Sequence, residues 1–352
     1  MDQVGSGARS AAEPVAPVPL LEVDDLSVEF ATPDGVVRAV NGLTCSVSAG
    51  QTLAIVGESG RGKSVSSQAV MGLLQSPPAR ITSGEIRYQG TNLLALDKTA
   101  HRRFCGSHIA MVFQDALAAL NPVYTVGWQL TEALVARRRL SRSAARTRAV
   151  ELLDMVKVPN AARRVKEFPH QFSGGMRQRV MIAMALALDP EVLIADEPTT
   201  ALDVTVQAQI MRLLADIQAE HKMGMILITH DLGVGADVAD KVTVMYAGRA
   251  VEQAGVIDLY TAPAHPYTRV LLHSIPRLDR KGSDLAVIAG RPPELTNIPA
   301  GCAFHPRCDL AQDICRRPPA PPVVELPGDR TSACHFAEEV LADDDRSDCR
   351  DW

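Results

Sequence analysis

Residues 51–74 read QTLAIVGESGRGKSVSSQAVMGLL, and this stretch decides the fold. It begins with a short apolar run typical of a buried strand, continues through a glycine-rich loop, and ends in a pattern typical of a helix. The loop, GESGRGKS at residues 57–64, has the glycine, lysine and hydroxyl spacing of a phosphate-binding loop. Because this loop requires a strand before it and a helix after it, the stretch predicts an α/β domain that binds a nucleotide.

The residues of this loop have distinct expected roles. Backbone amides of such a loop surround the phosphates. We expect Lys63 to reach the β- and γ-phosphates and the hydroxyl of Ser64 to bind Mg2+. The other loop residues expected at the nucleotide are Gly57, Glu58, Ser59, Gly60, Arg61 and Gly62.

A second signal is VLIADEP at residues 192–198, an apolar run that ends in two acids. Two adjacent carboxylates at the end of a strand repel each other unless a cation lies between them. We expect Asp196 to hold Mg2+, directly or through water. We expect Glu197 to be the general base that polarises the water attacking the γ-phosphate.

The rest of the central sequence alternates short apolar runs with helical patterns. Strands are predicted at residues 223–230 and, as a pair, at residues 241–253. Residues 203–220 carry apolar side chains at three- and four-residue steps, which predicts a helix with one apolar face. That face consists of Val206, Ile210, Leu213, Leu214 and Ile217. This alternation is typical of a mostly parallel sheet with crossover helices.

Composition limits the class of protein. The 352 residues carry a net charge of −5, so the chain has no overall basic field and no nucleic-acid partner is expected. No run of about 18 apolar residues occurs, and a membrane role would therefore need partner chains. Residues 1–20 are small and proline-rich without the apolar core of a secretory leader, and we predict a disordered tail there.

A third signal is FSGGMRQRV at residues 172–180. Ser173, Gly174 and Gly175 come directly before a helical pattern, where exposed amides and a hydroxyl make an anion site. The same residues also suit an ordinary loop and helix cap. Together with the phosphate loop and the paired acids, they resemble the Ser-Gly-Gly signature of the ABC-type ATPase family.

This resemblance implies a fold and further site residues. The implied fold is an α/β P-loop ABC-type nucleotide-binding domain, with a parallel-sheet core, an antiparallel β subdomain, and a helical subdomain at about residues 115–185. Gln114 matches the glutamine loop that senses Mg2+ and the γ-phosphate, and His230 matches the switch histidine that contacts the γ-phosphate. Asp203 matches the loop that crosses between subunits, and Phe30 falls where the family stacks an aromatic ring on adenine.

The resemblance also implies a dimer. In this family the signature of one subunit completes the nucleotide site of the other, and this chain has one phosphate loop and one signature. Activity therefore implies a head-to-tail pair, of this chain with itself or with a related ATPase, that closes over two ATP molecules.

A narrower resemblance covers residues 21–336, nearly the whole folded chain. The segments LNPVYTVGWQLTEAL, HPYTRVLLHSIP and PAGCAFHPRC resemble ATPase subunits of dipeptide, oligopeptide and nickel importers. The implied setting is the cytoplasmic face of the inner membrane, with two permease subunits and an extracytoplasmic substrate-binding protein as partners. Peptide is the expected cargo, and nickel or another small solute is the alternative. A soluble ABC ATPase of DNA repair or translation is the rival class, but such members pair two modules and this chain has one.

Four cysteines lie close together in a proline-rich region: Cys302, Cys308, Cys315 and Cys334. Disulfides would be unusual in a reducing cytosol, so these thiols suggest a metal that orders a weakly periodic segment. Zinc prefers more closely spaced pairs, four thiolates suit an iron–sulfur cluster, and free or redox-active thiols are the third possibility. The subfamily resemblance implies a 4Fe–4S cluster. The cysteines not expected to bind metal are Cys45, Cys105 and Cys349.

The sequence therefore divides into four predicted parts. Near residue 256 the regular spacing of apolar residues gives way to a proline-rich sequence. The parts are a tail at 1–20, an ATPase domain at 21–255, a C-terminal extension with the cysteine site at 256–338, and an acidic tail at 339–352.

Overall fold

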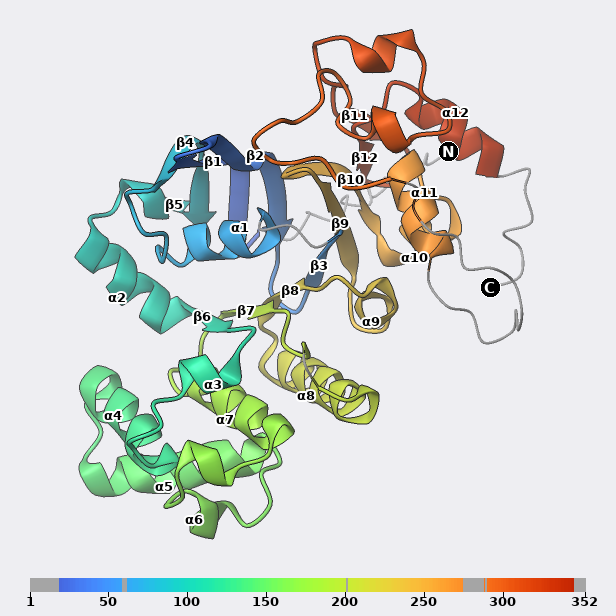
Figure 1. Cartoon of the computed structure of the whole chain (residues 1–352). Helices are drawn as coiled ribbons and strands as arrows, with labels where there is room; N and C mark the ends of the chain where they lie inside the picture. The colour runs from blue at the N-terminus through green and yellow to red at the C-terminus, as the bar shows by residue number, and fades with distance from the viewer. Residues whose placement is uncertain (1–18, 59–61, 201, 275–287, 289, 345–352) are drawn as a thin grey trace, which may run out of the picture.

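The fold comes from a computed structural model that describes residues 19–58, 62–200, 202–274, 288 and 290–344. The tail predicted at residues 1–20 lies almost wholly outside these ranges. Figure 1 shows a central sheet with a group of antiparallel strands at its upper left, a helical group below, and the C-terminal segments at its upper right.

The central sheet has eight strands in the order β11-β12-β10-β9-β3-β8-β7-β6. The five strands from β9 to β6 run parallel to one another. In that order they are Lys241–Tyr246, Thr52–Val56, Gly224–Ile228, Val192–Asp196 and Ile109–Val112. Every residue of β3, β7 and β8 is buried, as expected for a parallel sheet covered on both faces. The predicted α/β fold with a parallel-sheet core is confirmed.

A second sheet is antiparallel and has the strand order β2-β1-β4-β5. Its strands are Leu21–Thr32 (β1), Gly35–Val47 (β2), Ala79–Tyr88 (β4) and Thr91–Asn92 (β5). In β1 and β2 buried residues such as Val28 and Leu43 recur between more exposed ones, because only one face of this sheet packs on the core. That core includes residues of α1 (Gly62–Val70) and of the central strands.

The helical group follows β6 and contributes five helices. They are Ala116–Ala119 (α3), Val126–Arg138 (α4), Arg142–Met155 (α5), Ala161–Arg164 (α6) and Gly174–Leu186 (α7). Thr125, Ser141 and Ser173 begin α4, α5 and α7, and each side-chain hydroxyl accepts a hydrogen bond from an amide in the first turn. The group shares one apolar cluster with α8 (Val204–His221) and with strands of the central sheet.

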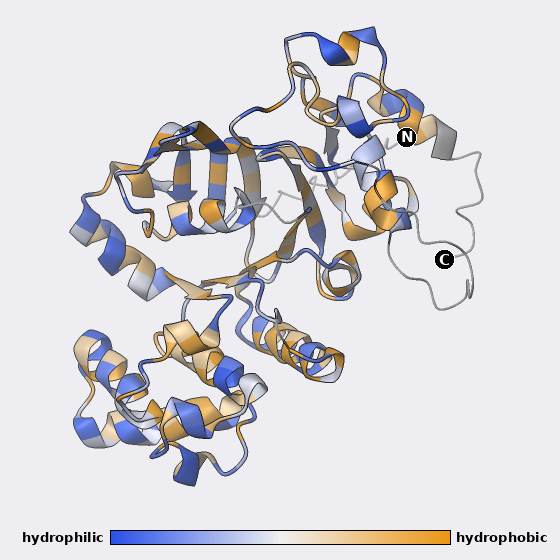
Figure 2. Ribbon diagram, in the orientation of Figure 1, coloured by the Kyte–Doolittle hydropathy of each residue, from blue (hydrophilic) through white to orange (hydrophobic). Residues whose placement is uncertain are grey.

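The helix predicted at residues 203–220 is α8. Ile210, Leu213, Leu214 and Ile217 are buried on its apolar face, and Val206 packs partly buried against the same cluster. Figure 2 shows that hydrophobic residues also lie along the central strands, whereas hydrophilic residues lie along α2 (Lys98–His108). None of the described helices is long and apolar enough to cross a lipid bilayer.

The C-terminal extension continues the central sheet. Strand β10 (Arg249–Gly255) pairs antiparallel with β9 on one side and with β12 (Arg330–Ser332) on the other, and β11 (Val324–Leu326) completes the edge. The remaining helices, including short 3-10 turns, are η1 (Leu93–Ala95), η2 (Pro169–Gln171), α9 (Leu232–Ala236), α10 (Val256–Thr261), α11 (Pro266–His273), η3 (His305–Arg307), η4 (Asp313–Arg316) and α12 (Ala337–Asp344).

The extension also shares its core with the sheet. Tyr267 and Phe304 are almost fully buried in a cluster that includes Val56 and Val244 of the central strands. A smaller apolar cluster lies within the extension itself and is formed by Ala264, Leu326, Cys334 and Ala337.

Candidate nucleotide site

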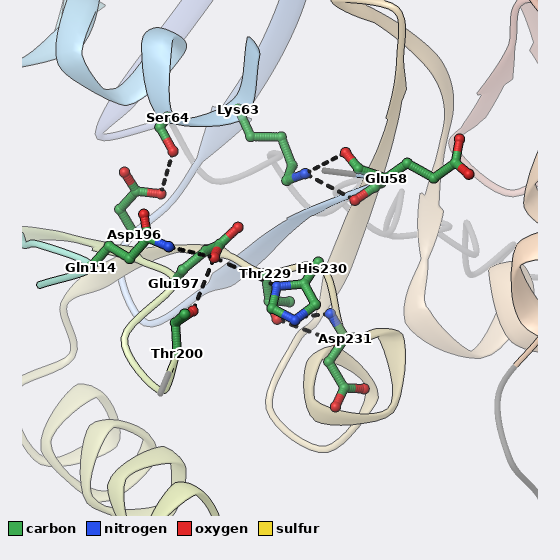
Figure 3. A network of polar contacts seen from close by, with 11 residues as sticks. Glu58, Lys63, Ser64, Gln114, Asp196, Glu197, Thr200, Thr229, His230 and Asp231 are labelled. Carbon is green, nitrogen blue, oxygen red and sulfur yellow. Dashed lines mark hydrogen bonds and ion pairs between the residues drawn. The ribbon is translucent and has the colours of Figure 1, made fainter. Parts of the chain in front are cut away.

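Strand β3 and helix α1 place the first half of the site. Lys63 lies in the first turn of α1, and its Nζ donates to the carbonyl oxygens of Gly57 and Glu58, both at 2.9 Å. Figure 3 shows these two contacts. Lys63 is buried, which lowers its pKa, while the carboxylates of Glu197, Asp196 and Glu58 act in the opposite direction. The ammonium therefore lies among carboxylates and is held by two carbonyl oxygens at the start of α1. Ser59, Gly60 and Arg61 lie outside the described residues.

Gly57 is required by its surroundings. Its backbone φ is +147°, and a Cβ added there would lie 2.2 Å from the carbonyl oxygen of Met245 in β9. No side chain fits so close to a backbone atom, so the start of the phosphate loop can pass the neighbouring strand only as glycine.

Asp196 and Ser64, the two residues predicted to hold Mg2+, are in contact. The Ser64 hydroxyl donates to Asp196 Oδ1 at 2.9 Å. Burial raises the pKa of Asp196, and the neighbouring Glu197 carboxylate adds to this effect, whereas the hydrogen bond from Ser64 and the charge of Lys63 oppose it. A hydroxyl and a buried carboxylate in contact are hard oxygen donors of the kind that Mg2+ takes together with phosphate oxygens, so these residues fit the ion.

Glu197 is the centre of a polar network drawn in Figure 3. Its Oε2 accepts hydrogen bonds from Gln114 Nε2 at 3.1 Å and from the Thr200 hydroxyl at 2.9 Å. His230 Nδ1 lies 3.5 Å from the same oxygen. Glu197 itself has a positive φ of 45°, a conformation that non-glycine residues rarely adopt and that is typical of functional positions.

Sheet topology explains why these side chains meet. Gln114 follows β6, Glu197 follows β7 and His230 follows β8, and the three strands are parallel neighbours. Their carboxyl ends therefore open at one edge of the sheet, where α/β proteins bind their ligands. The arrangement can orient a water molecule and take a proton from it beside the phosphates.

The residues of the predicted Ser-Gly-Gly signature, and Asp203, lie at the N-termini of α7 and α8. Ser173 caps α7 by accepting from the Met176 amide at 3.4 Å, and Asp203 caps α8 by accepting from the Val206 amide at 3.0 Å. A Cβ added to Gly175 would lie 2.6 Å from Val206 Cγ1, so Gly175 allows α7 and α8 to pack closely. Among the contacts of the described residues, none joins Ser173 or its two glycines to the phosphate loop of the same chain.

Phe30, expected at the adenine ring, lies in the antiparallel sheet, and three residues that were not predicted contact Glu197 or Glu58. Phe30 lies in β1 opposite Val37 and is partly buried against the core between the two sheets. Sequence reasoning did not single out Thr200, although a hydroxyl three residues after Glu197 was its available signal. It also missed Tyr267 and Arg307, which contact the phosphate-loop residue Glu58 from the C-terminal extension.

The four cysteines of the extension line one small cavity: Cys302, Cys308, Cys315 and Cys334. All four are free of disulfide bonds. Burial raises the pKa of Cys308 to about 11 and that of Cys334 to about 12, which keeps these thiols protonated at neutral pH when no metal is bound. Over the described part of the chain, no three His, Cys, Asp or Glu side chains form a group that could hold a single metal ion.

The fold and the geometry of this site together define a class. Residues 40–200 match the family described as ABC transporter. The dimeric post-hydrolysis structure of the ATP-binding cassette MJ0796, bound to ADP and Pi, is similar with a TM-score of 0.60 and 26% identity, over 67% of this chain and 98% of that one. The chain is an ATPase of the ATP-binding cassette class.

Curated relatives narrow this class. Residues 251–315 match the family described as Oligopeptide/dipeptide transporter, C-terminal region. The Oligopeptide transport ATP-binding protein OppD of Salmonella typhimurium is 50% identical over 92% of this chain and 95% of its own length. The Dipeptide transport ATP-binding protein DppD of Bacillus subtilis is 50% identical over 85% and 89%. The chain belongs to the family of oligopeptide and dipeptide transport ATP-binding proteins.

Proposed function

We propose that this chain is the ATP-hydrolysing subunit of an importer of dipeptides and oligopeptides, working at the cytoplasmic face of the cell membrane. The observation that carries the proposal is the similarity to peptide transport ATP-binding proteins over both the ATPase core and the C-terminal region. Two permease subunits and an extracytoplasmic binding protein are the partners that such a subunit needs.

In the proposed mechanism each chain supplies two halves of different sites. Lys63 binds the β- and γ-phosphates, Ser64 and Asp196 hold Mg2+, and Glu197 takes a proton from the attacking water. Ser173 of the opposite subunit caps the γ-phosphate from the N-terminus of its α7. Because ATP binds the closed dimer better than the open one, binding drives closure and hydrolysis allows opening.

The helical group provides a surface for the permeases. A groove of about 920 Å3 runs between its helices and is lined by residues of α4, α5 and the α6 region, including Trp128, Val135 and Val150. Trp128 and Tyr124 are both exposed, and their rings stack with centroids 3.9 Å apart. An exposed aromatic pair beside a groove that mixes apolar residues with charged ones such as Glu132 and Arg146 suits a protein partner. We place the permease contact here.

Peptide uptake tests this function. The complex is reconstituted in vesicles with its permeases and binding protein, and uptake of labelled dipeptides and oligopeptides is measured with ATP inside or outside. We expect uptake only when ATP is on the side of this subunit. Uptake of nickel but not of peptides would identify nickel as the cargo. A chain that binds no permease would instead favour the soluble class of ABC ATPases.

We further propose that the cysteine cavity holds a 4Fe–4S cluster with a structural role. The proposal is supported by the four cysteines that line one cavity, none of which is in a disulfide. A cluster fills the space between its thiolates, so its ligands need not stand as close together as around a single zinc ion. Such a cluster would fasten the loops of the extension to one another.

Iron analysis tests this site. We expect about four irons and four acid-labile sulfides per chain after purification without oxygen, and loss of both in Cys308→Ser. Cys45→Ala is the matched control, because Cys45 is buried in the core between the two sheets. Stoichiometric zinc without iron would show that the cysteines bind zinc and not a cluster. A metal-free chain would contradict both the cluster and the zinc site.

A further inference from the structure

The C-terminal extension reaches the phosphate loop through Arg307. The Arg307 guanidinium donates to both carboxylate oxygens of Glu58, from Nη1 at 2.6 Å and from Nη2 at 2.9 Å. Its Nη1 also lies 3.3 Å from the hydroxyl of Tyr246. The Arg307 side chain is only 4% exposed and that of Glu58 25%. This is a two-pronged, largely desolvated ion pair, the kind in which loss of one partner is costly.

The backbone of Glu58 is held from the same side. Its amide donates to the hydroxyl of Tyr267 in α11 at 2.9 Å, and Tyr267 is fully buried. The ring of Tyr267 packs on those of Tyr246 and Phe304, with centroids 4.6 Å and 5.3 Å away. The hydroxyl that meets the loop is therefore fixed by a packed aromatic cluster.

A third contact lies nearby. The Arg38 amide in β2 donates to the carbonyl oxygen of Leu295 at 3.2 Å. Residues 292–296 form one wall of a cavity of about 420 Å3 whose other walls include Glu58, Gly62 and Lys63. The extension thus borders the nucleotide side of the molecule at several points.

The ion pair also holds the Glu58 carboxylate away from the Lys63 ammonium. Figure 3 shows the Glu58 carboxylate pointing away from Lys63, while the Glu58 carbonyl oxygen accepts from Lys63 Nζ. If Arg307 were absent, the carboxylate would be free to turn toward Lys63. It would then compete with the phosphates for that ammonium and repel them.

We propose that Arg307 and Tyr267 are positioning residues that, from the C-terminal extension, hold Glu58 at the start of the phosphate loop in the place that ATP binding requires. Arg307 lies in the η3 turn directly before Cys308, so the segment between two cysteines of the thiol cavity also sets the affinity for nucleotide. The inference rests on the ATPase class alone and holds for any transported cargo.

A double-mutant cycle on the full-length chain tests the ion pair. The dissociation constant of a fluorescent ATP analogue is measured, together with KM and kcat, for Arg307→Gln, Glu58→Gln and the double variant. We expect Arg307→Gln to weaken binding and raise KM roughly tenfold, with a smaller change in kcat. The double variant should bind the analogue more tightly than Arg307→Gln, because the uncompensated carboxylate is gone.

Further variants keep the test decisive if Arg307→Gln folds poorly. Arg307→Lys should recover part of the affinity, since it keeps the charge but loses the two-pronged geometry. Tyr267→Phe removes only the hydroxyl that faces the Glu58 amide and should weaken binding about threefold. Arg316→Gln is the matched control, because Arg316 lies exposed in η4 of the same extension.

Two results would overturn the proposal. One is an unchanged affinity for the analogue in folded Arg307→Gln and in Tyr267→Phe. The other is strict additivity of the Arg307 and Glu58 substitutions, which would mean that the two side chains act separately.

Discussion

Glu197→Gln is expected to lower kcat by about 10²–10⁴-fold while the affinity for ATP changes by less than about twofold. Glutamine keeps the size of the side chain and an oxygen that can accept from Gln114 and Thr200, so the network around it stays in place. It cannot take a proton from water. The measurement is steady-state hydrolysis beside equilibrium binding of labelled ATP.

The same variant should accumulate as an ATP-bound dimer, because closure is intact and the step that reopens the pair is blocked. Size analysis with ATP and with ADP would detect it. Glu191→Gln is the matched control, since Glu191 precedes β7 and its carboxylate contacts Gln89 and His108 on the surface. Undiminished hydrolysis in Glu197→Gln would remove that residue from the role of general base.

Arg330→Leu is expected to lower the free energy of unfolding by about 3–5 kcal/mol. Arg330 and Glu252 form a buried pair at 3.5 Å between β12 and β10, with side chains 7% and 0% exposed. Glu252 Oε1 also accepts from the Ala264 amide at 2.7 Å. Without the arginine, a buried carboxylate loses its cation. Urea unfolding of the variant and the wild type would measure the loss.

The pH dependence of this loss identifies its cause. Burial raises the pKa of Glu252 to about 7, against opposing hydrogen bonds and the charge of Arg330. The folded chain therefore binds a proton that the unfolded chain releases above about pH 4.5, and the stability due to Glu252 falls as pH rises from about 4.5 to 7. Removing Arg330 extends this window upward, so the loss should be larger at pH 8 than at pH 5.

A surface pair supplies the control for Arg330→Leu. Arg163 and Glu167 lie 3.8 Å apart and Arg163 is 69% exposed, so Arg163→Leu should change stability by less than about 1 kcal/mol at either pH. Equal losses at pH 5 and pH 8 in Arg330→Leu would show that Glu252 is not the group left uncompensated.

Local sequence was sufficient for the parts of the fold that repeat a short pattern. The strands at β3, β7 and β8 are continuous apolar runs, and α8 carries its apolar residues at helical spacing, so each was predictable within a few residues. The convergence of Gln114, Glu197 and His230 was expected from a family resemblance. The parallel order of β6, β7 and β8 supplies its physical reason.

Contacts between residues that are far apart in the sequence had no local pattern that could predict them. Glu58 and Arg307 are 249 residues apart, and neither belongs to a pattern that names its partner. The proline-rich texture near residue 256 suggested a separate part of the chain. Strands β11 and β12 are only three residues long, too short for periodicity to reveal that they join the central sheet.

The sheet order has a consequence for biosynthesis. Strand β12 and Arg307 are synthesised long after the phosphate loop, yet β12 pairs with β10 in the central sheet and Arg307 contacts Glu58, 249 residues earlier in the chain. A nascent or truncated chain without the extension would lack the Arg307 contact to Glu58, whose carbonyl oxygen accepts from Lys63. If Arg307 positions Glu58 as proposed, a chain still without its extension would bind ATP more weakly, so full affinity for ATP would arise only once the extension has been made.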